Sequence, residues 1–420
     1  MSDERADAAP PAGPVLHAAW LTSNVDPYRA ELLRTGEPDL ERILQLLPRP
    51  AGPAAFDGAV IAGSIERLRK SVDVRTAHPF LDLSVLTGLA YIDATFQGNH
   101  PKYGVGAYAH NAHDGFPPTV IAAVDALSAW GLVQRAQEIM GYWLTRFVRE
   151  DGTIDYYGPA LSEYGQLLHT AVRLCARGAD PAWWQMHLGA LRRLASWMMG
   201  RIRQADGDLV RGCPEADEAG DAGRYFHNNA WLAAGLACFD SECRRRGDPA
   251  DPQMAAMAAE LKDRTLDAIA AAWPADPADY WLVPQVEPRE RPHRVTASRI
   301  GSYTNYRYWP ELLSSGILPP ELAARIVQAR LSFGGQFLGT TRFMDWLDDW
   351  PLFDCLSGLH RYGYRNDLLL SLYGHIVYHQ AEGHLTAYEQ VSFPPGRAKA
   401  AYCLPAQLVA ARTVALLAGR

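Results

Sequence analysis

The sequence lacks several features that mark specialised classes of protein. No uninterrupted apolar run approaches the roughly 18 residues that a membrane-spanning helix needs. No run of Lys and Arg forms the basic stripe typical of a nucleic-acid-binding protein, and the net charge is −7. We therefore expect neither a membrane nor a nucleic acid as a partner.

Cysteine is also scarce, with six residues and no CxxC pair among them. This spacing argues against a disulfide framework and against a zinc site. We expect scattered thiols in a cytoplasmic protein that needs no metal or other cofactor.

The first 14 residues are acidic, rich in Ala and Pro, and without the apolar segment of a secretory signal. We expect a disordered tail over 1–14, followed by a single catalytic domain over 15–420. Hydrophobic residues make up 48% of the chain, which is enough for a large core.

Helical periodicity dominates from about residue 56 onward. Between Pro117 and Gly131, for example, apolar residues recur at three- and four-residue spacing after two prolines that suit a first helical turn. Similar patterns predict helices over 56–71, 79–94, 117–131, 133–148, 160–177, 181–204, 226–246, 252–272, 305–315, 319–331, 349–363, 366–380 and 398–418. These paired helices, without a repeating sequence period, favour an all-α (α/α)6 barrel over an open solenoid.

Five irregular stretches separate these helices, at 95–116, 206–225, 273–304, 332–348 and 381–397. Loops longer than about 12–15 residues in a compact domain are usually functional or disordered. These are rich in aromatic, acidic and amide side chains, which favours a function at one end of the ring.

The stretch Asp206–Trp231 carries a cluster of carboxylates, Glu215, Asp217, Glu218 and Asp221, before a helix that starts near Phe226. Apolar surroundings raise a carboxyl pKa, as a general acid requires near neutral pH. A solvated acidic loop is the alternative. His227 and Asn228 lie in the first turn of the following helix and are candidates for substrate binding.

The stretch Glu382–Gly396 places Glu389 among apolar neighbours, next to Tyr388. Burying a carboxylate among apolar side chains costs free energy unless a cation pairs with it or it serves the chemistry of a site. Glycoside hydrolysis needs one carboxylic acid to protonate the leaving oxygen and a second carboxylate to activate water or attack the sugar. Glu389 and the 215–218 cluster are therefore a candidate pair, although a salt-bridged structural role for Glu389 is the alternative.

Further candidates for binding a sugar come from three other segments. His113 and Asp114 stand at the entrance of the 117–131 helix, where Asp114 has a helix cap as its alternative role. The other candidates are Tyr306, Arg307, Asp345, Trp346, Asp349 and Trp350. Their aromatic rings could stack on a sugar ring and their charged groups could bind its hydroxyls. A Trp-rich turn packed in the core is the alternative interpretation.

Three segments resemble the six-hairpin glycosidases, a superfamily with glucoamylase-type and maltose-phosphorylase-like members. AYEQV…PPG…LPAQLVAA around Glu389 resembles the segment with the catalytic base, and PEADE…HNNAW is similar to the loop with the general acid. HDGFPPTVIAAVDALSAWG resembles the entrance whose Asp grips the sugar, but His113 replaces the usual Arg. The resemblance implies Glu218 as acid, with Glu215 as its competitor, and Glu389 as base.

The leading hypothesis is thus an inverting glycoside hydrolase acting on a carbohydrate or glycoside. An (α/α)6 sugar epimerase working through His227, His379 and His384 is one alternative. An enzyme or binding protein for a terpenoid or other small metabolite is another, because aromatic pockets also serve hydrocarbons. The sequence leaves the sugar, the linkage and the oligomeric state open.

Overall fold

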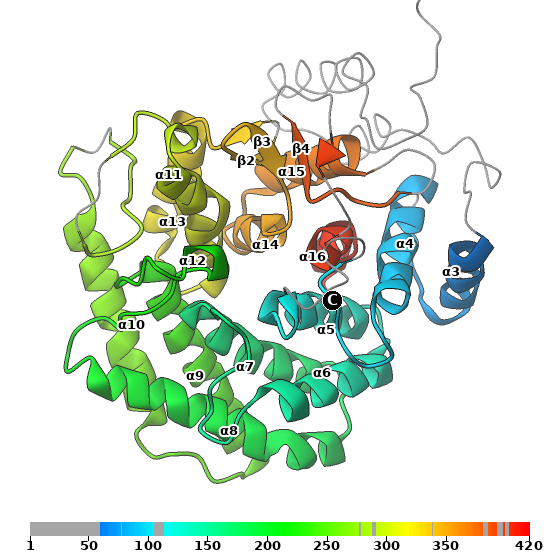
Figure 1. Cartoon of the computed structure of the whole chain (residues 1–420), viewed down its shortest axis with the longest axis horizontal. Coiled ribbons are helices and arrows are strands. Elements are labelled where there is room, and N and C mark those ends of the chain that lie inside the picture. Colours follow the sequence, from blue (N-terminus) through cyan, green and yellow to red (C-terminus); the bar gives the residue numbers. More distant parts are fainter. Residues whose placement is uncertain are drawn as a thin grey trace, which may run out of the picture.

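The computed structural model describes residues 59–76, 78–104, 113–276, 279–287, 291–337, 339–380, 385–392, 398–399 and 403–420. Its helices follow one another around the molecule in sequence order, from α4 through α9 to α15, so that the C-terminal segment returns to α4 and α5 (Figure 1). None of the described helices is both long and apolar enough to span a bilayer.

Six helices form a closed inner ring. Each packs against the next, and the last of them packs against the first. They are α5 (Pro117–Ala129), α7 (Leu161–Ala176), α9 (Phe226–Arg246), α12 (Trp309–Ser315), α14 (Leu352–Arg361) and α17 (Val409–Leu417). The predicted (α/α)6 barrel is confirmed.

Six further helices surround this ring and alternate with it along the chain. They are α4 (Pro79–Thr95), α6 (Val133–Phe147), α8 (Pro181–Gln204), α10 (Met254–Ala272), α13 (Pro320–Ser332) and α15 (Arg365–His379). A helix α3 (Ala59–Ser71) packs outside α4. Helices α7 and α9 approach closely because Gly165 and Gly235 face each other, and a Cβ at Gly165 would lie 1.9 Å from the carbonyl oxygen of Trp231.

The alternation gives the ring a direction. Consecutive helices joined by short turns are antiparallel, so the six inner helices all point the same way and their N-terminal ends meet at one end of the ring. We call this end the mouth. All five long stretches predicted from the sequence precede inner helices and therefore lie there. Helix N-termini carry partial positive charge, so the mouth favours carboxylates.

A small antiparallel sheet at the mouth was not predicted from the sequence. Its five strands pair in sequence order: β1 (Gln336–Phe337), β2 (Thr340–Phe343), β3 (Trp346–Asp348), β4 (Gln390–Ser392) and β5 (Ala398–Lys399). The strands are two to four residues long, too short to show a period-two pattern. Their pairing brings the 332–348 and 381–397 stretches together.

Two predicted helices differ from those observed. The helix expected over 305–315 starts earlier, as α11 (Arg299–Tyr303), and passes through a π-helical turn η6 (Thr304–Tyr308) into α12. The helix expected over 398–418 is divided into β5, the short α16 (Leu404–Gln407) and α17. A π turn inside a helix is often found at a functional site, and η6 faces the mouth.

Candidate functional site

A layer of aromatic side chains lines the mouth, contributed by segments that precede different inner helices. Its buried members are Tyr103, Phe116, Tyr225, Tyr303, Tyr306, Tyr308 and Trp350, with Tyr156 and Phe343 packed against them. The ring of Trp350 lies 5.7 Å from that of Phe116 and 5.8 Å from that of Tyr306, both edge to face. These contacts join the loops before α5, α12 and α14 into one surface.

Glu389 and Asp348 are both buried and lie side by side next to this layer. Asp348 pairs with Gln390 across β3 and β4, which places Glu389 next to it. The Tyr103 hydroxyl donates to Glu389 Oε1 at 3.1 Å, and the Gln390 amide donates to Asp348. Burial and the charge of Glu389 raise the pKa of Asp348 well above its usual range. Two carboxylates held this close disfavour each other's ionisation.

Glu218 and Asp217 lie at the same end of the ring as Glu389. They belong to a short 3-10 turn, η4 (Ala216–Glu218), where Glu218 forms an ion pair with Arg299. Burial raises the pKa of Tyr303, and Asp217, Glu218 and Asp348 all add to this effect. Burial likewise raises the pKa of Tyr306, with further contributions from Asp348 and Glu389. The two proposed glutamates thus converge on neighbouring tyrosines.

Glu215 and Arg307 lie behind the mouth instead of on its surface. Arg307 is fully buried and forms ion pairs with Glu215, with Glu163 at 2.6 Å and with Glu311 at 2.6 Å. Glu215 also accepts a hydrogen bond from the Asp217 backbone N–H at 3.2 Å. Burial raises the pKa of Glu163 to about 7 despite the opposing charge of Arg307. Three carboxylates thus share one guanidinium beneath the acid loop, which they anchor.

His113 and Asp114 occupy different environments. His113 Nδ1 lies 3.2 Å from the Tyr156 hydroxyl, and burial lowers the His113 pKa although Asp217 opposes this. Asp114 pairs with His100 at 2.5 Å and with Lys102 at 3.4 Å. His113 therefore faces the acid loop, whereas Asp114 is held by two basic side chains outside the aromatic layer.

His227 and Asn228 are buried supports. The ring of His227 stacks on that of Tyr308, with 4.6 Å between the ring centres, and burial lowers the pKa of His227. Asn228 accepts from the Ser162 backbone N–H and donates to the Cys213 carbonyl oxygen, both at 3.0 Å. These bonds fasten the acid loop to the start of α7, and Asn228 is fully buried.

The remaining candidates flank β3. Asp345 is exposed and Trp346 is half-buried. Asp349 turns inward, where its Oδ2 lies 3.0 Å from His375 Nδ1 and 3.3 Å from His379 Nε2. Tyr388 is buried, and its carbonyl oxygen accepts from His379 Nδ1 at 2.8 Å. Asp349 and Tyr388 therefore fix the two segments that carry Asp348 and Glu389.

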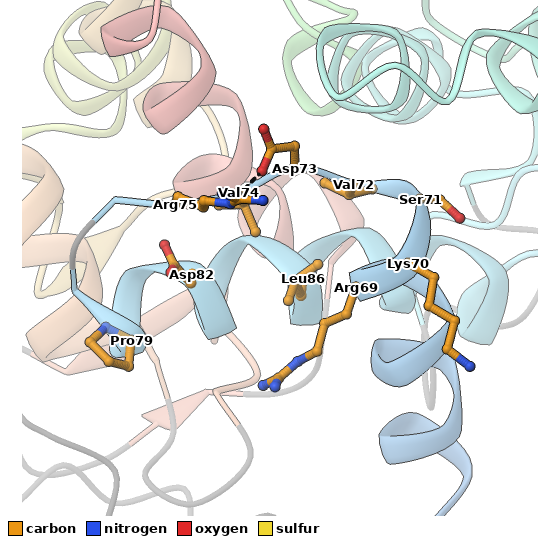
Figure 2. Close-up of a pocket in the computed structure, with 10 residues that line it drawn as sticks. All are labelled: Arg69, Lys70, Ser71, Val72, Asp73, Val74, Arg75, Pro79, Asp82 and Leu86. Carbon is orange, nitrogen blue, oxygen red and sulfur yellow. Dashed lines mark ion pairs between the residues drawn. The ribbon is translucent and has the colours of Figure 1, made fainter.

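Cavity volume alone does not locate this site. A cavity of about 460 Å³ lies between α3 and α4, beside the exposed Asp73–Arg75 ion pair, and none of its lining residues comes from the mouth (Figure 2). A smaller cavity of about 80 Å³ is lined by residues of all six inner helices and by Trp350, so it lies on the ring axis below the aromatic layer. Among the described residues, no group of three His, Cys, Asp or Glu side chains could hold a metal ion.

Comparisons with solved structures identify the fold. A wild-type glycosidase matches with a TM-score of 0.58 at 13% identity, over 82% of this chain and 99% of that one. A glycosidase variant in complex with glucose gives the same values. An unsaturated glucuronyl hydrolase specific for heparin matches with a TM-score of 0.54 at 11% identity, over 81% and 96%.

The chain has the six-hairpin glycosidase fold. No family model matches it, and no curated protein does either. At these identities the match shows the fold alone. The resemblance seen in the sequence is therefore confirmed at the level of the fold, and the glucoamylase or maltose-phosphorylase subtype stays a prediction.

Sequence reasoning missed two important members of the site. Tyr103 belongs to a predicted loop, and only the fold reveals that it reaches Glu389. Asp348 was visible in the alternation of Trp and Asp over 345–350, but nothing in the sequence showed that β3 would pair it with Gln390. His384, which belongs to the epimerase alternative, lies outside the described residues.

Proposed function

We propose that the protein is a glycoside hydrolase whose substrate binds at the mouth. The observation that carries this proposal is the attachment of both glutamates to one aromatic layer. Arg299 pairs with Glu218 and donates to the Tyr303 hydroxyl, the Tyr103 hydroxyl binds Glu389, and both tyrosines belong to that layer. Aromatic faces suit the apolar face of a sugar ring, and paired carboxylates supply the acid and base of glycoside hydrolysis.

Glu389 is proposed as the base that activates water, held by the Tyr103 hydroxyl. Glu218 is proposed as the acid that protonates the leaving oxygen. Its side chain is 15% exposed, so substrate can reach it. Asp348 has a raised pKa beside Glu389 but is fully buried, so it is the weaker candidate for the donor. Glu215 is assigned to the support of the acid loop because its carboxylate is taken up by Arg307.

The solved structures support the same reaction class. All three that we compared are named as glycosidases or as a glycoside-cleaving hydrolase, and one holds glucose. Two of the matching glycosidase structures carry a glutamate-to-alanine replacement, each at a different glutamate.

The buried histidines disfavour an epimerase. His227 is 1% exposed and His379 is 0% exposed, and both lie behind the tyrosine layer in contacts with backbone carbonyls. Neither could exchange a proton with a sugar bound at the mouth without a rearrangement of that layer.

The test is hydrolysis of a panel of nitrophenyl glycosides by the wild type and by Glu389→Gln, Glu218→Gln and Asp348→Asn. Glu260→Gln, an exposed residue on the outer helix α10, is the matched control. Loss of turnover in Glu389→Gln, with unchanged helical circular dichroism, is expected. Retained turnover in that variant would overturn the assignment of the base.

The general acid can be identified from how the activity of each variant depends on the leaving group of the substrate. If Glu218 donates the proton, Glu218→Gln should lose far more activity on alkyl glycosides than on nitrophenyl glycosides, because a good leaving group needs no proton. If Asp348→Asn shows that pattern instead, Asp348 is the donor. The anomer released first, observed by NMR, reports inversion or retention.

A further inference from the structure

The cavity on the ring axis below the aromatic layer opens at the end of the ring opposite to the mouth. Its volume of about 80 Å³ holds one molecule of roughly five to eight non-hydrogen atoms, at about 10–15 Å³ for each water-sized group. Trp231, Trp350 and Glu311 line it toward the mouth and are buried. Arg173 is partly exposed and Arg361 is exposed, and both lie in the last turns of inner helices.

Guanidinium groups dominate the open side of this cavity. Arg173 and Arg412 line it, and they pair with Asp125 at 3.2 and 3.1 Å. Arg177, behind the wall, pairs with the same carboxylate at 2.8 Å. Arg361 also lines the cavity, and it forms no ion pair within the part of the chain that the structure describes. This side of the cavity therefore favours an anionic group.

The opposite polarity prevails toward the mouth. His169 and Asp354 both line the cavity. Burial lowers the pKa of His169 to about 4, and the charges of nearby arginines, Arg173 first among them, add to this effect. Burial and the charge of Glu311 raise the pKa of Asp354 to about 6, although Arg412 opposes this. The cavity is thus positive beside His169 and negative beside Asp354 and Glu311.

Two buried polar atoms in the cavity wall have no hydrogen-bond partner among the described residues. Gln166 Nε2 is a donor, and Gln166 is 7% exposed. Glu311 Oε2 is an acceptor on a side chain that is 2% exposed, and the other oxygen of Glu311 binds Arg307 at 2.6 Å. Leaving such atoms unpaired costs free energy. A molecule that accepts from Gln166 and donates to Glu311 satisfies both.

We propose that this cavity is a binding site for a small zwitterion of the α-amino-acid type. Its carboxylate lies against Arg173, Arg361 and Gln166, and its ammonium group lies against Glu311 and Asp354. A simple anion would leave the Glu311 oxygen unpaired, and a simple cation would leave the Gln166 amide unpaired. The volume admits only a small side chain. The site shares no residue with the proposed catalytic carboxylates, so it stands or falls independently of glycoside hydrolysis.

The probes for the test are L-alanine, which carries both charged groups, and propionate and ethylamine, which each carry one. Titrations followed by saturation-transfer NMR of their methyl protons give the Kd of each probe. We expect L-alanine to bind at least tenfold more tightly than either of the others, since one hydrogen bond to a charged group is worth about a factor of ten. Equally tight binding of propionate or ethylamine would overturn the proposal, as would the absence of saturable binding of L-alanine.

Two variants test the location of the site. Arg361→Gln and Gln166→Leu should each weaken binding of L-alanine about tenfold, with unchanged helical circular dichroism. Arg365→Gln is the matched control, an exposed arginine on the outer helix α15 that does not line the cavity. Arg361→Gln decides the matter if Gln166→Leu does not fold, because Arg361 is exposed. Unchanged affinity in Arg361→Gln, or an equal loss in Arg365→Gln, would refute the assignment.

Discussion

Because Arg307 is paired with three buried glutamates, we expect the free energy of unfolding to depend on pH. Replacing Arg307 by Met leaves Glu163, Glu215 and Glu311 buried without their shared cation. Removing one partner of a buried ion pair costs about 3–5 kcal/mol. We expect Arg307→Met to lower the free energy of unfolding by about 4 kcal/mol at pH 8 and by much less at pH 5.

The sign follows from Glu163, whose pKa burial raises from 4.5 to about 7 even beside Arg307. A carboxyl with a raised pKa in the folded state stabilises the fold below its unfolded pKa, and this contribution is lost as pH rises through the folded value. In the wild type this corresponds to about 3 kcal/mol lost between pH ~4 and pH ~7. Without Arg307 the pKa of Glu163 rises further, so the cost of the substitution grows with pH.

Urea unfolding followed by circular dichroism at pH 5, 6, 7 and 8 measures this. Arg299→Met is the control, because it removes an ion pair from a side chain that is 55% exposed and should change stability by less than about 1 kcal/mol. A cost for Arg307→Met that is the same at pH 5 and pH 8 would refute the account of shared buried charge.

Three further outcomes are expected. Gly165→Ala should destabilise the fold by about 3 kcal/mol in thermal or urea unfolding, because its Cβ meets the backbone of α9. Gly200→Ala, in open space on α8, should instead be neutral or stabilise by up to about 1 kcal/mol. Asp348→Asn should gain stability relative to the wild type as pH rises from 5 to 9, since the raised pKa of Asp348 makes its ionisation costly; a flat difference would contradict this. Tyr103→Phe should lower kcat on nitrophenyl glycosides through loss of the bond to Glu389, with unchanged circular dichroism.

The helical part of the fold was accessible from the sequence. The helix predicted over 181–204 has those bounds, and most others agree within three residues. Their apolar stripes repeat over three or four turns, which gives a strong signal. The sheet gave no such signal, because its strands are two to four residues long and its β3–β4 pairing joins segments more than forty residues apart. The π turn at 304–308 likewise depends on packing at the mouth.

The sequence predicted at which end of the ring the candidate site lies better than it predicted which residues belong to that site. Long loops rich in aromatic and acidic residues pointed to one end of the ring, and Glu218 and Glu389 lie there together. Burial was not predictable in the same way. Arg307 and Asn228 look like ligand-binding residues in the sequence, yet the first neutralises buried carboxylates and the second ties two backbone segments together. Such roles depend on partners far away in the chain.

The closure of the ring by α17 also constrains how the fold assembles. Helix α17 packs against α4, α5 and α14, and Arg412 reaches Asp125 on α5 at 3.1 Å across 287 positions of sequence. Until α17 has packed, the ring is open between α14 and α5, and its apolar lining stays in contact with water along that seam. A folding intermediate that lacks this one helix would therefore expose apolar surface and be prone to aggregation.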